Sequence, residues 1–350
     1  MKIVYVGTKY DFGKMSRSYN HEYVSFYDTL IKMENHKHEV VPFFYDEVIM
    51  KFGKKMNQLL IEFIKNESPD LVFFLVSYEI DKRTIKEITR LTTTFNWFTD
   101  DHWQFEIFSK NYAPLFDYVS TTDFRSVEKY HKIGYKNVIR TQWGYNHYMY
   151  EPIRDKKDYG ITFIGQKYGN RDKIIDKIIS KNLKINCYGN GWENKRVSEN
   201  LMNKIFTNSE VNLNLADSSF ASMHLELPGI LIRKDISGCL HVRKFEELLP
   251  RAVLLLKKRR PQIKARVFEV VGCGGLLLST NVEGLDNYYV PNKEIVVFND
   301  SDEMIKKLKY LHNELNEKDR RKIAMAGWKR SLREHTYEKR FNDIFRIIGL

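Results

Sequence analysis

The sequence predicts an α/β protein made of two doubly wound domains, each with a parallel sheet. Short apolar segments of strand length alternate with amphipathic segments of helical period along nearly the whole chain, a pattern typical of consecutive βαβ units. At 350 residues the chain is longer than a single hydrophobic core supports, and 43% of its residues are hydrophobic. A polar, proline-containing stretch at 144–158 separates the two series and is the predicted linker.

The first series contains continuous apolar strands with helical stripes between them. Because each strand is followed by a helix and then another strand, right-handed crossovers and a parallel sheet are expected. The predicted strands are 2–6, 39–44, 71–76, 96–99, 118–121 and 137–141, and the predicted helices are 23–31, 56–64, 82–89 and 126–133. The second series has predicted strands at 161–164, 185–188, 211–215, 276–279 and 295–298.

Residues 261–280 combine a helix start, a helix stop and a buried strand. Pro261 suits the first helical position, and glycines after residue 271 end the helix. Arg266 and Glu269 are three residues apart and therefore share a helix face. A helix that begins at the mouth of a parallel sheet directs free N–H groups toward a ligand, commonly a phosphate, and Glu269 could accept hydrogen bonds from a sugar hydroxyl. A surface helix with a solvated Glu269 is the equally open alternative.

Two further strand ends carry glycine loops. Gly165 ends a strand, and the loop after it leads into a helix at Arg171, an arrangement that can cradle a phosphate beside a guanidinium. An ordinary first-turn surface residue is the alternative for Arg171. The second loop contains Gly189 and Trp192, whose ring could stack on a base, or whose glycines could simply form a turn.

Asp100, Asp101 and His102 follow a strand of the first domain, so they are expected at the edge of the sheet where ligands bind. A carboxylate or an imidazole at such an edge can take a proton from a substrate or stabilise a cationic transition state. Asp101 fits the N-cap of a following helix nearly as well as catalysis, and His102 fits a packed loop residue.

Composition restricts the class of protein and its partners. The formal net charge is +12, of which residues 221–268 supply +7, from eleven Lys and Arg against four acids. Such charge suits an anionic partner, but no nucleic-acid-binding signature accompanies it, so nucleic acid ranks below a phosphorylated substrate or a membrane surface. The three cysteines lack zinc or disulfide spacing. No apolar run is long enough for a signal segment or a membrane span, so a cytoplasmic location is expected.

Within the basic segment, the stretch 245–256, mainly apolar but containing Glu246, Glu247 and Arg251, is followed by Lys257, Lys258, Arg259 and Arg260. Apolar residues followed by basic ones are typical of a membrane-surface segment, so peripheral contact with an anionic membrane is one interpretation. A helix packed on the domain with a solvated basic end is the alternative, and an acceptor-shaping insertion is another.

The ordered set of motifs resembles the GT-B glycosyltransferases, and most closely the spore-maturation CgeB-like group. The motifs include Trp97–Asp101, Tyr159–Gly165 with Arg171, Cys187–Trp192, Arg266–Glu269 with Gly272–Leu278, and Glu334–Tyr337. Many retaining members carry a pair of glutamates eight residues apart, but the residue eight positions before Glu269 is Pro261, so the first glutamate of the pair is missing here.

The resemblance implies two Rossmann-like domains facing a cleft, a first domain at 1–148, a donor-binding domain at 149–335 with an insertion at about 218–260, and a last segment, 336–350, that returns to the first domain. It implies a nucleotide-sugar donor, a hydroxyl-bearing acceptor such as a glycan, lipid or protein, and no metal or other cofactor. The implied donor-binding residues are Gly165, Arg171, Gly189, Trp192, Gln262, Ile263, Arg266, Glu269 and Gly274. The resemblance also makes Asp100 the first catalytic candidate, because its place matches an aspartate of the family and sugar transfer needs a group that takes a proton or stabilises a cationic transition state. The missing first glutamate keeps open the alternative of a non-catalytic protein that binds a nucleotide sugar or an anionic polymer.

Overall fold

The computed structural model describes residues 1–33, 38–153, 158–216, 231–234, 239–242, 248 and 261–350. Contacts divide the chain into two compact units. The first comprises Met1–Gln142, Leu225–Lys258 and Arg340–Leu350, and the second comprises Trp143–His224 and Arg259–Lys339. Most of the basic segment, including Lys257, Lys258, Arg259 and Arg260, lies outside the described residues.

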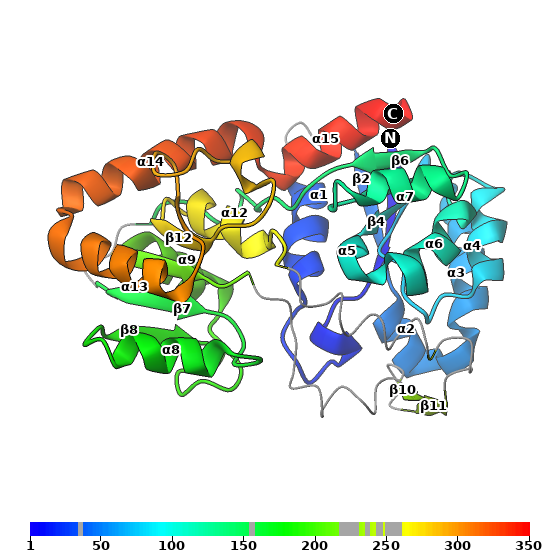
Figure 1. The fold of residues 1–350 in the computed structure, drawn as a ribbon. Helices are drawn as coiled ribbons and strands as arrows, with labels where there is room; N and C mark the ends of the chain where they lie inside the picture. Colours follow the sequence, from blue (N-terminus) through cyan, green and yellow to red (C-terminus); the bar gives the residue numbers. More distant parts are fainter. Residues whose placement is uncertain (34–37, 154–157, 217–230, 235–238, 243–247, 249–260) are drawn as a thin grey trace. The chain divides into compact units, whose positions relative to one another are not determined.

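The first unit is built on a six-stranded parallel sheet (Figure 1). Its strand order is β2-β1-β3-β4-β5-β6, with neighbours such as Ile3 and Leu71 in register. Strands β1 and β3 are apolar along almost their whole length, which suits a sheet covered on both faces. The strands are β1 Lys2–Gly7, β2 Glu39–Phe44, β3 Leu71–Phe74, β4 Thr93–Phe98, β5 Tyr118–Thr121 and β6 Val138–Arg140.

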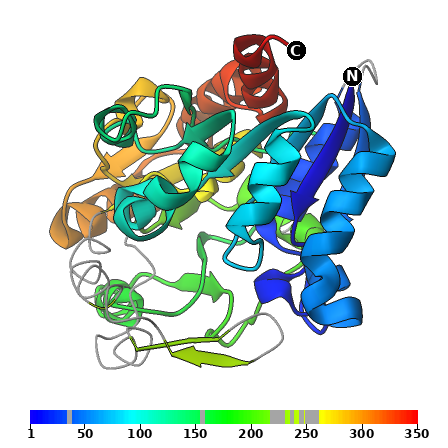
Figure 2. The same ribbon diagram turned by 90° about the vertical axis from the view of Figure 1, so that its right-hand side faces the viewer.

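Alternate residues of these strands pack on opposite sides of the first sheet. Tyr5, Phe73 and Trp97 lie on the side of Phe26 and of Phe341 in α15 (Tyr337–Ile348). Val4, Val72, Phe74 and their neighbours pack with α3 and α4 on the other side. Figure 2, seen from the side of α3 and α4, shows these helices in front of the strands. Besides α15, the α-helices that the structure describes in this unit, α3 and α4 included, are α1 Asp28–Lys32, α2 Tyr45–Phe52, α3 Met56–Glu67, α4 Lys82–Thr89, α5 Asp101–Gln104, α6 Lys110–Tyr112 and α7 Ser126–Lys132.

The second unit has a five-stranded parallel sheet in the order β13-β12-β9-β7-β8. Its core gathers the strand residues Phe163, Leu213 and Leu278 with Ile175 of α8 and Leu308 of α13. The strands are β7 Ile161–Ile164, β8 Ile185–Tyr188, β9 Val211–Asn214, β12 Leu277–Thr280 and β13 Val296–Phe298, and the helices are α8 Arg171–Ile179, α9 Glu199–Asn208, α12 Ala265–Gly272, α13 Ser301–Lys309 and α14 Glu317–Glu334. Two short strands, β10 Ile232–Lys234 and β11 Leu240–Val242, pair antiparallel.

Every strand predicted from the two apolar series is present, with ends that differ by a few residues. The predicted start of the helix at Pro261 is wrong, because α12 begins at Ala265 after an extended Lys264. The backbone N–H of Gln262 donates to the carbonyl of Ala216 at 3.4 Å, so this residue is bonded to the chain after β9 and the helix starts three residues later. Glu269 is therefore only one turn into the helix.

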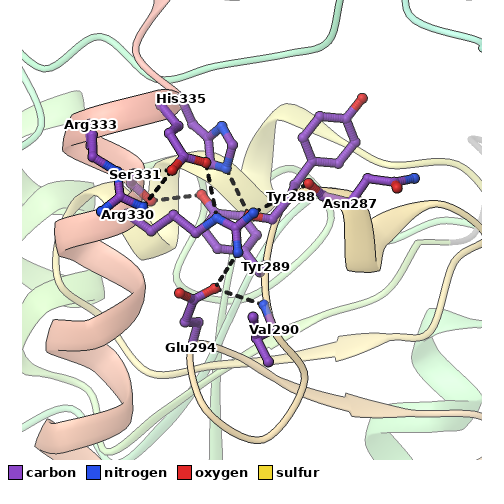
Figure 3. A network of polar contacts seen from close by, with 10 residues as sticks. Asn287, Tyr288, Tyr289, Val290, Glu294, Arg330, Ser331, Arg333 and His335 are labelled. Carbon is purple, nitrogen blue, oxygen red and sulfur yellow. Dashed lines mark hydrogen bonds and ion pairs between the residues drawn. The ribbon is translucent and has the colours of Figure 1, made fainter.

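A polar network fastens the segment before β13 to α14 (Figure 3). The Arg330 guanidinium forms ion pairs with Glu294 and Glu334, both at 3.1 Å, and Glu294 also accepts the N–H of Val290 at 2.7 Å. His335 bonds the carbonyl of Tyr288 at 2.8 Å through Nε2. This network holds the outer layer of the second unit in place.

Among the described residues, no helix combines the length and the apolar character that a membrane crossing requires.

Candidate functional site

Gly165 and Gly189 meet at the carboxyl edge of the second sheet. They follow the neighbouring parallel strands β7 and β8, so their loops leave the sheet side by side. Gly189 has a φ of 127°, and a Cβ there would lie 2.3 Å from the carbonyl oxygen of Gly165. Gly189 is therefore needed for close backbone approach, whereas a Cβ at Gly165 would meet the side chains of Phe163 and Arg171 at 2.9 and 3.1 Å.

Trp192 locks these two loops together. Its indole Nε1–H donates to the Gly165 carbonyl at 2.8 Å, and its ring lies edge-on to Phe163 at 6.1 Å between centroids. The indole N–H is thus used inside the protein, so base stacking would fall to the part of the ring that stays exposed. Lys167, an exposed cation of the first loop, has its Nζ 5.2 Å from that ring's centroid.

Arg171 is the first residue of α8 and is only 7% exposed. Its Nη1 donates to the Gln166 carbonyl at 2.9 Å, and its Nη2 donates to the Leu215 carbonyl at 3.2 Å. The guanidinium also lies 4.0 Å from the centroid of the Tyr168 ring. Arg171 therefore joins the loop after β7 to the end of β9, so its effect on a ligand would pass mainly through the loop that it shapes.

Lys167 is a candidate that sequence reasoning missed. Lys167 lies in the loop, and Arg171, the cation predicted to meet the ligand, is the first residue of α8. The position of each residue could have indicated which cation is exposed. A long side chain at the first residue of a helix can fold back on the strand ends, whereas a side chain in the middle of a loop faces solvent.

Arg266 and Glu269 form an ion pair on α12, with Nη1 and Oε2 2.7 Å apart. The shared face predicted from their spacing is confirmed. Glu269 is 2% exposed, and the Arg266 side chain is 27% exposed, so the arginine covers the carboxylate from solvent. The Arg266 guanidinium also stacks over Phe206 at 5.1 Å. A ligand at this edge would meet Arg266 first.

Two titratable groups near Glu269, the Tyr150 phenol and the Cys273 thiol, have raised pKa values. Burial, reinforced by the charge of Glu269, holds the pKa of the Tyr150 phenol and of the Cys273 thiol well above their ordinary values. Both groups are therefore neutral at physiological pH. Arg266 is the cation that offsets the charge of this carboxylate.

Gln262 and Ile263 lie between the end of β9 and the start of α12, at the same carboxyl edge as Gly165 and Gly189. Gly274 does not. It precedes β12 and so lies at the amino edge of the sheet, opposite the edge of the other residues predicted to bind the donor. There it lines a cavity of about 660 Å³ together with Glu210, Arg320 and Met325.

In the first unit, Asp100 and His102 are half-buried at the carboxyl end of β4, and the Gln104 amide lies 3.5 Å from the Asp100 carboxylate. Asp100 is the N-cap residue of α5, but its side chain makes no capping bond. Asp101 is the first helical residue, so the interpretation of Asp101 as the N-cap is wrong. Asp101 is fully buried and accepts a hydrogen bond from the Tyr130 hydroxyl at 2.7 Å. The structure thus makes Asp101 a tie between α5 and α7.

Burial raises the pKa of Asp101 to about 6, while hydroxyls of Ser109, Thr121 and Tyr130 lower it. The folded protein therefore binds this proton more tightly than the unfolded chain, and stability falls as pH rises from about 4 to about 6. Two pH units correspond to about 3 kcal/mol. Asp101→Asn should remove this slope, measured as urea unfolding free energies at pH 4.5 and pH 7.5. An unchanged difference between the two pH values would assign the slope to other groups.

Comparison with known proteins identifies the family. The model of the glycosyl transferase-like family matches residues 149–346, which is more than half of the chain. The chain belongs to this family. A search of curated proteins gives no match to the sequence.

Several solved structures share the fold along almost the whole chain. Sucrose-phosphate synthase from Thermosynechococcus elongatus has a TM-score of 0.59 at 8% identity and covers 99% of both chains. A glycosyltransferase from Rickettsia africae has a TM-score of 0.59 at 11% identity, covering 99% of this chain and 97% of its own. HepE from Anabaena, solved with UDP, has a TM-score of 0.57 at 8% identity and covers 100% of both chains. The glycosyl transferase-like chain therefore has the GT-B fold, with two Rossmann-like domains.

Proposed function

We propose that this chain transfers a sugar from a nucleoside diphosphate sugar to a hydroxyl-bearing acceptor. The donor would bind at the carboxyl edge of the second sheet, over the interlocked loops of Gly165 and Gly189. The observation that carries the proposal is the Arg266–Glu269 pair, which puts a buried carboxylate under a partly exposed guanidinium at that edge, inside the region that the family model matches.

The chemistry of a nucleoside diphosphate fits these groups. Arg266 and Lys167 are cations able to meet the diphosphate, and the extended approach to α12 brings the first N–H groups of that helix to the same edge. A carboxylate such as Glu269 accepts hydrogen bonds from ribose hydroxyls once Arg266 turns toward the phosphates. Because HepE has been solved with UDP and with UDP-glucose, uridine nucleotides are the first to test.

We also propose that helix N–H groups and cations offset the diphosphate charge without a divalent metal.

The proposal further includes a cytoplasmic location for the protein and its membership of the CgeB-like group. Peripheral contact with an anionic membrane is also part of the proposal. Its support is that Leu240 and Val242 of β11, within the basic segment, are exposed. Cosedimentation with anionic and with neutral vesicles measures that contact.

Glu269→Ala should weaken nucleoside diphosphate binding by about 1.5–3 kcal/mol, the range for hydrogen bonds to charged groups. Isothermal calorimetry with UDP, GDP and ADP measures it. The matched control is Glu294→Ala. Glu294 also forms an ion pair with an arginine of the second unit, but that arginine is Arg330 of α14, in the network of Figure 3 and not at the proposed donor site. The control should lose stability and keep its nucleotide affinity.

If folded Glu269→Ala protein binds every nucleotide as tightly as the wild type, the donor site is elsewhere. If both variants lose affinity equally, the loss reflects the stability of the second unit and contradicts the role given to Glu269.

A further inference from the structure

A row of aromatic rings lies at the carboxyl end of β1 and β2 in the first unit. The ring centroids of Tyr10 and Tyr19 are 5.8 Å apart, those of Tyr19 and Tyr23 are 4.6 Å apart, and those of Tyr23 and Tyr27 are 5.4 Å apart. Their planes differ by only 30° to 36°. Neighbouring rings are thus tilted only slightly. We call Tyr10, Tyr19, Tyr23 and Tyr27 the tyrosine row.

The backbone beneath the tyrosine row is held rigidly. Asp46 is fully buried, and its Oδ2 accepts the N–H groups of Lys9 at 2.9 Å and of Tyr10 at 3.0 Å. Asn20 closes the loop by donating to the Thr8 carbonyl at 2.9 Å and accepting from the Tyr23 N–H at 2.6 Å. A built loop of this kind presents its rings in one arrangement, which lowers the entropy lost on binding.

Polar groups flank the exposed part of the row. Tyr19 is 46% exposed, and Phe12, two residues after Tyr10, is 66% exposed. Glu47 accepts from the Lys9 ammonium at 2.9 Å and from the Tyr10 hydroxyl at 3.1 Å. The surface therefore combines aromatic rings with a cation, a carboxylate and phenol hydroxyls.

This combination matches the two-sided chemistry of a pyranose. One face of a sugar ring presents C–H groups that pack on an aromatic ring, while the hydroxyls around it need hydrogen-bond partners. An isolated phosphate fits less well, because Glu47 already opposes Lys9. A lipid surface would gain little from the phenol hydroxyls and the carboxylate. We infer that the tyrosine row binds a pyranose ring of a glycan acceptor, an inference that rests on the proposed sugar transfer.

The test uses the full chain and soluble methyl glycosides and disaccharides of glucose, galactose, mannose and N-acetylglucosamine. Saturation-transfer NMR identifies which of them bind, and titration gives the affinity. Tyr19→Ala should weaken binding about tenfold, because it removes the tyrosine of the row that is 46% exposed. Tyr19→Phe keeps the ring and should stay within about twofold. Tyr310→Ala, at a 48% exposed tyrosine of the second unit, is the matched control and should match the wild type.

The inference is overturned if none of these saccharides binds the wild type, or if Tyr19→Ala binds them as well as the wild type. It is also overturned if Tyr19→Ala lowers binding to vesicles of anionic phospholipid and leaves saccharide binding unchanged. UDP affinity, measured on the same proteins, separates this failure from failure of the donor proposal, because Tyr19→Ala should leave it unchanged.

Discussion

Gly189→Ala is expected to destabilise the second unit by about 3 kcal/mol and to remove most nucleotide binding. A residue with a side chain at a φ of 127° carries a backbone cost of about 1–3 kcal/mol. The new methyl group would also lie 2.3 Å from the Gly165 carbonyl oxygen, which is backbone and cannot turn away. The two loops would have to separate, and Trp192 would lose its bond to the same carbonyl.

Gly160→Ala is the matched control for this effect. Gly160 also has a positive φ, 60°, but nothing lies within 4 Å of a Cβ there. This variant should show only the conformational cost and keep its nucleotide affinity. Calorimetric unfolding and UDP titration of both proteins give the comparison. Equal unfolding temperatures and equal affinities for the two variants would mean that the loops at the carboxyl edge neither clash nor hold the ligand.

Asp100→Asn is expected to lower turnover by about 10²–10⁴-fold while nucleotide affinity is kept, the usual cost of losing a positioned acid–base group. Asp100 is half-buried at the end of β4, and its hydrogen bond from the Gln104 amide is long, at 3.5 Å. A bond of that length is readily exchanged for a shorter one to a substrate hydroxyl. Asp101 is committed to Tyr130 in the interior and cannot reach a substrate without a change of the fold.

Asp101→Asn and His102→Ala are the controls that test this choice. The Asp101→Asn protein should turn over near the wild-type rate, because the new amide oxygen can still accept from Tyr130. If Asp100→Asn is active and His102→Ala is inactive, the edge is correct and the residue is wrong. If all three variants are active, the catalytic group lies elsewhere in the chain.

The strands could be predicted because continuous apolar runs and their flanking turns are local signals. The position of Gly274 could also have been predicted from the sequence. In a parallel sheet, a residue that precedes its strand lies at the opposite edge from a residue that follows its strand, and Gly274 precedes β12. The start of α12 was harder, because the contact between Gln262 and Ala216 joins residues far apart in sequence.

The directions of site side chains depended on tertiary structure. The guanidinium of Arg171 binds a carbonyl of β9's end, 44 residues away in sequence, and the carboxylate of Asp101 binds a hydroxyl 29 residues away. No periodicity encodes such partners. The Arg266–Glu269 pair, by contrast, lies within one helix turn, and its spacing was sufficient.

Release of free nucleotide from a nucleotide sugar is the most direct measurement of the central claim. The folded wild-type chain, supplied with UDP-glucose and other nucleotide sugars in the presence of EDTA, should release nucleotide, slowly by hydrolysis and faster with an acceptor, and Asp100→Asn should release far less. If the wild type binds nucleoside diphosphates but releases nothing from any donor, with EDTA or with added Mg²⁺ or Mn²⁺, the chain is a binding protein on a glycosyltransferase fold and the claim of sugar transfer is contradicted.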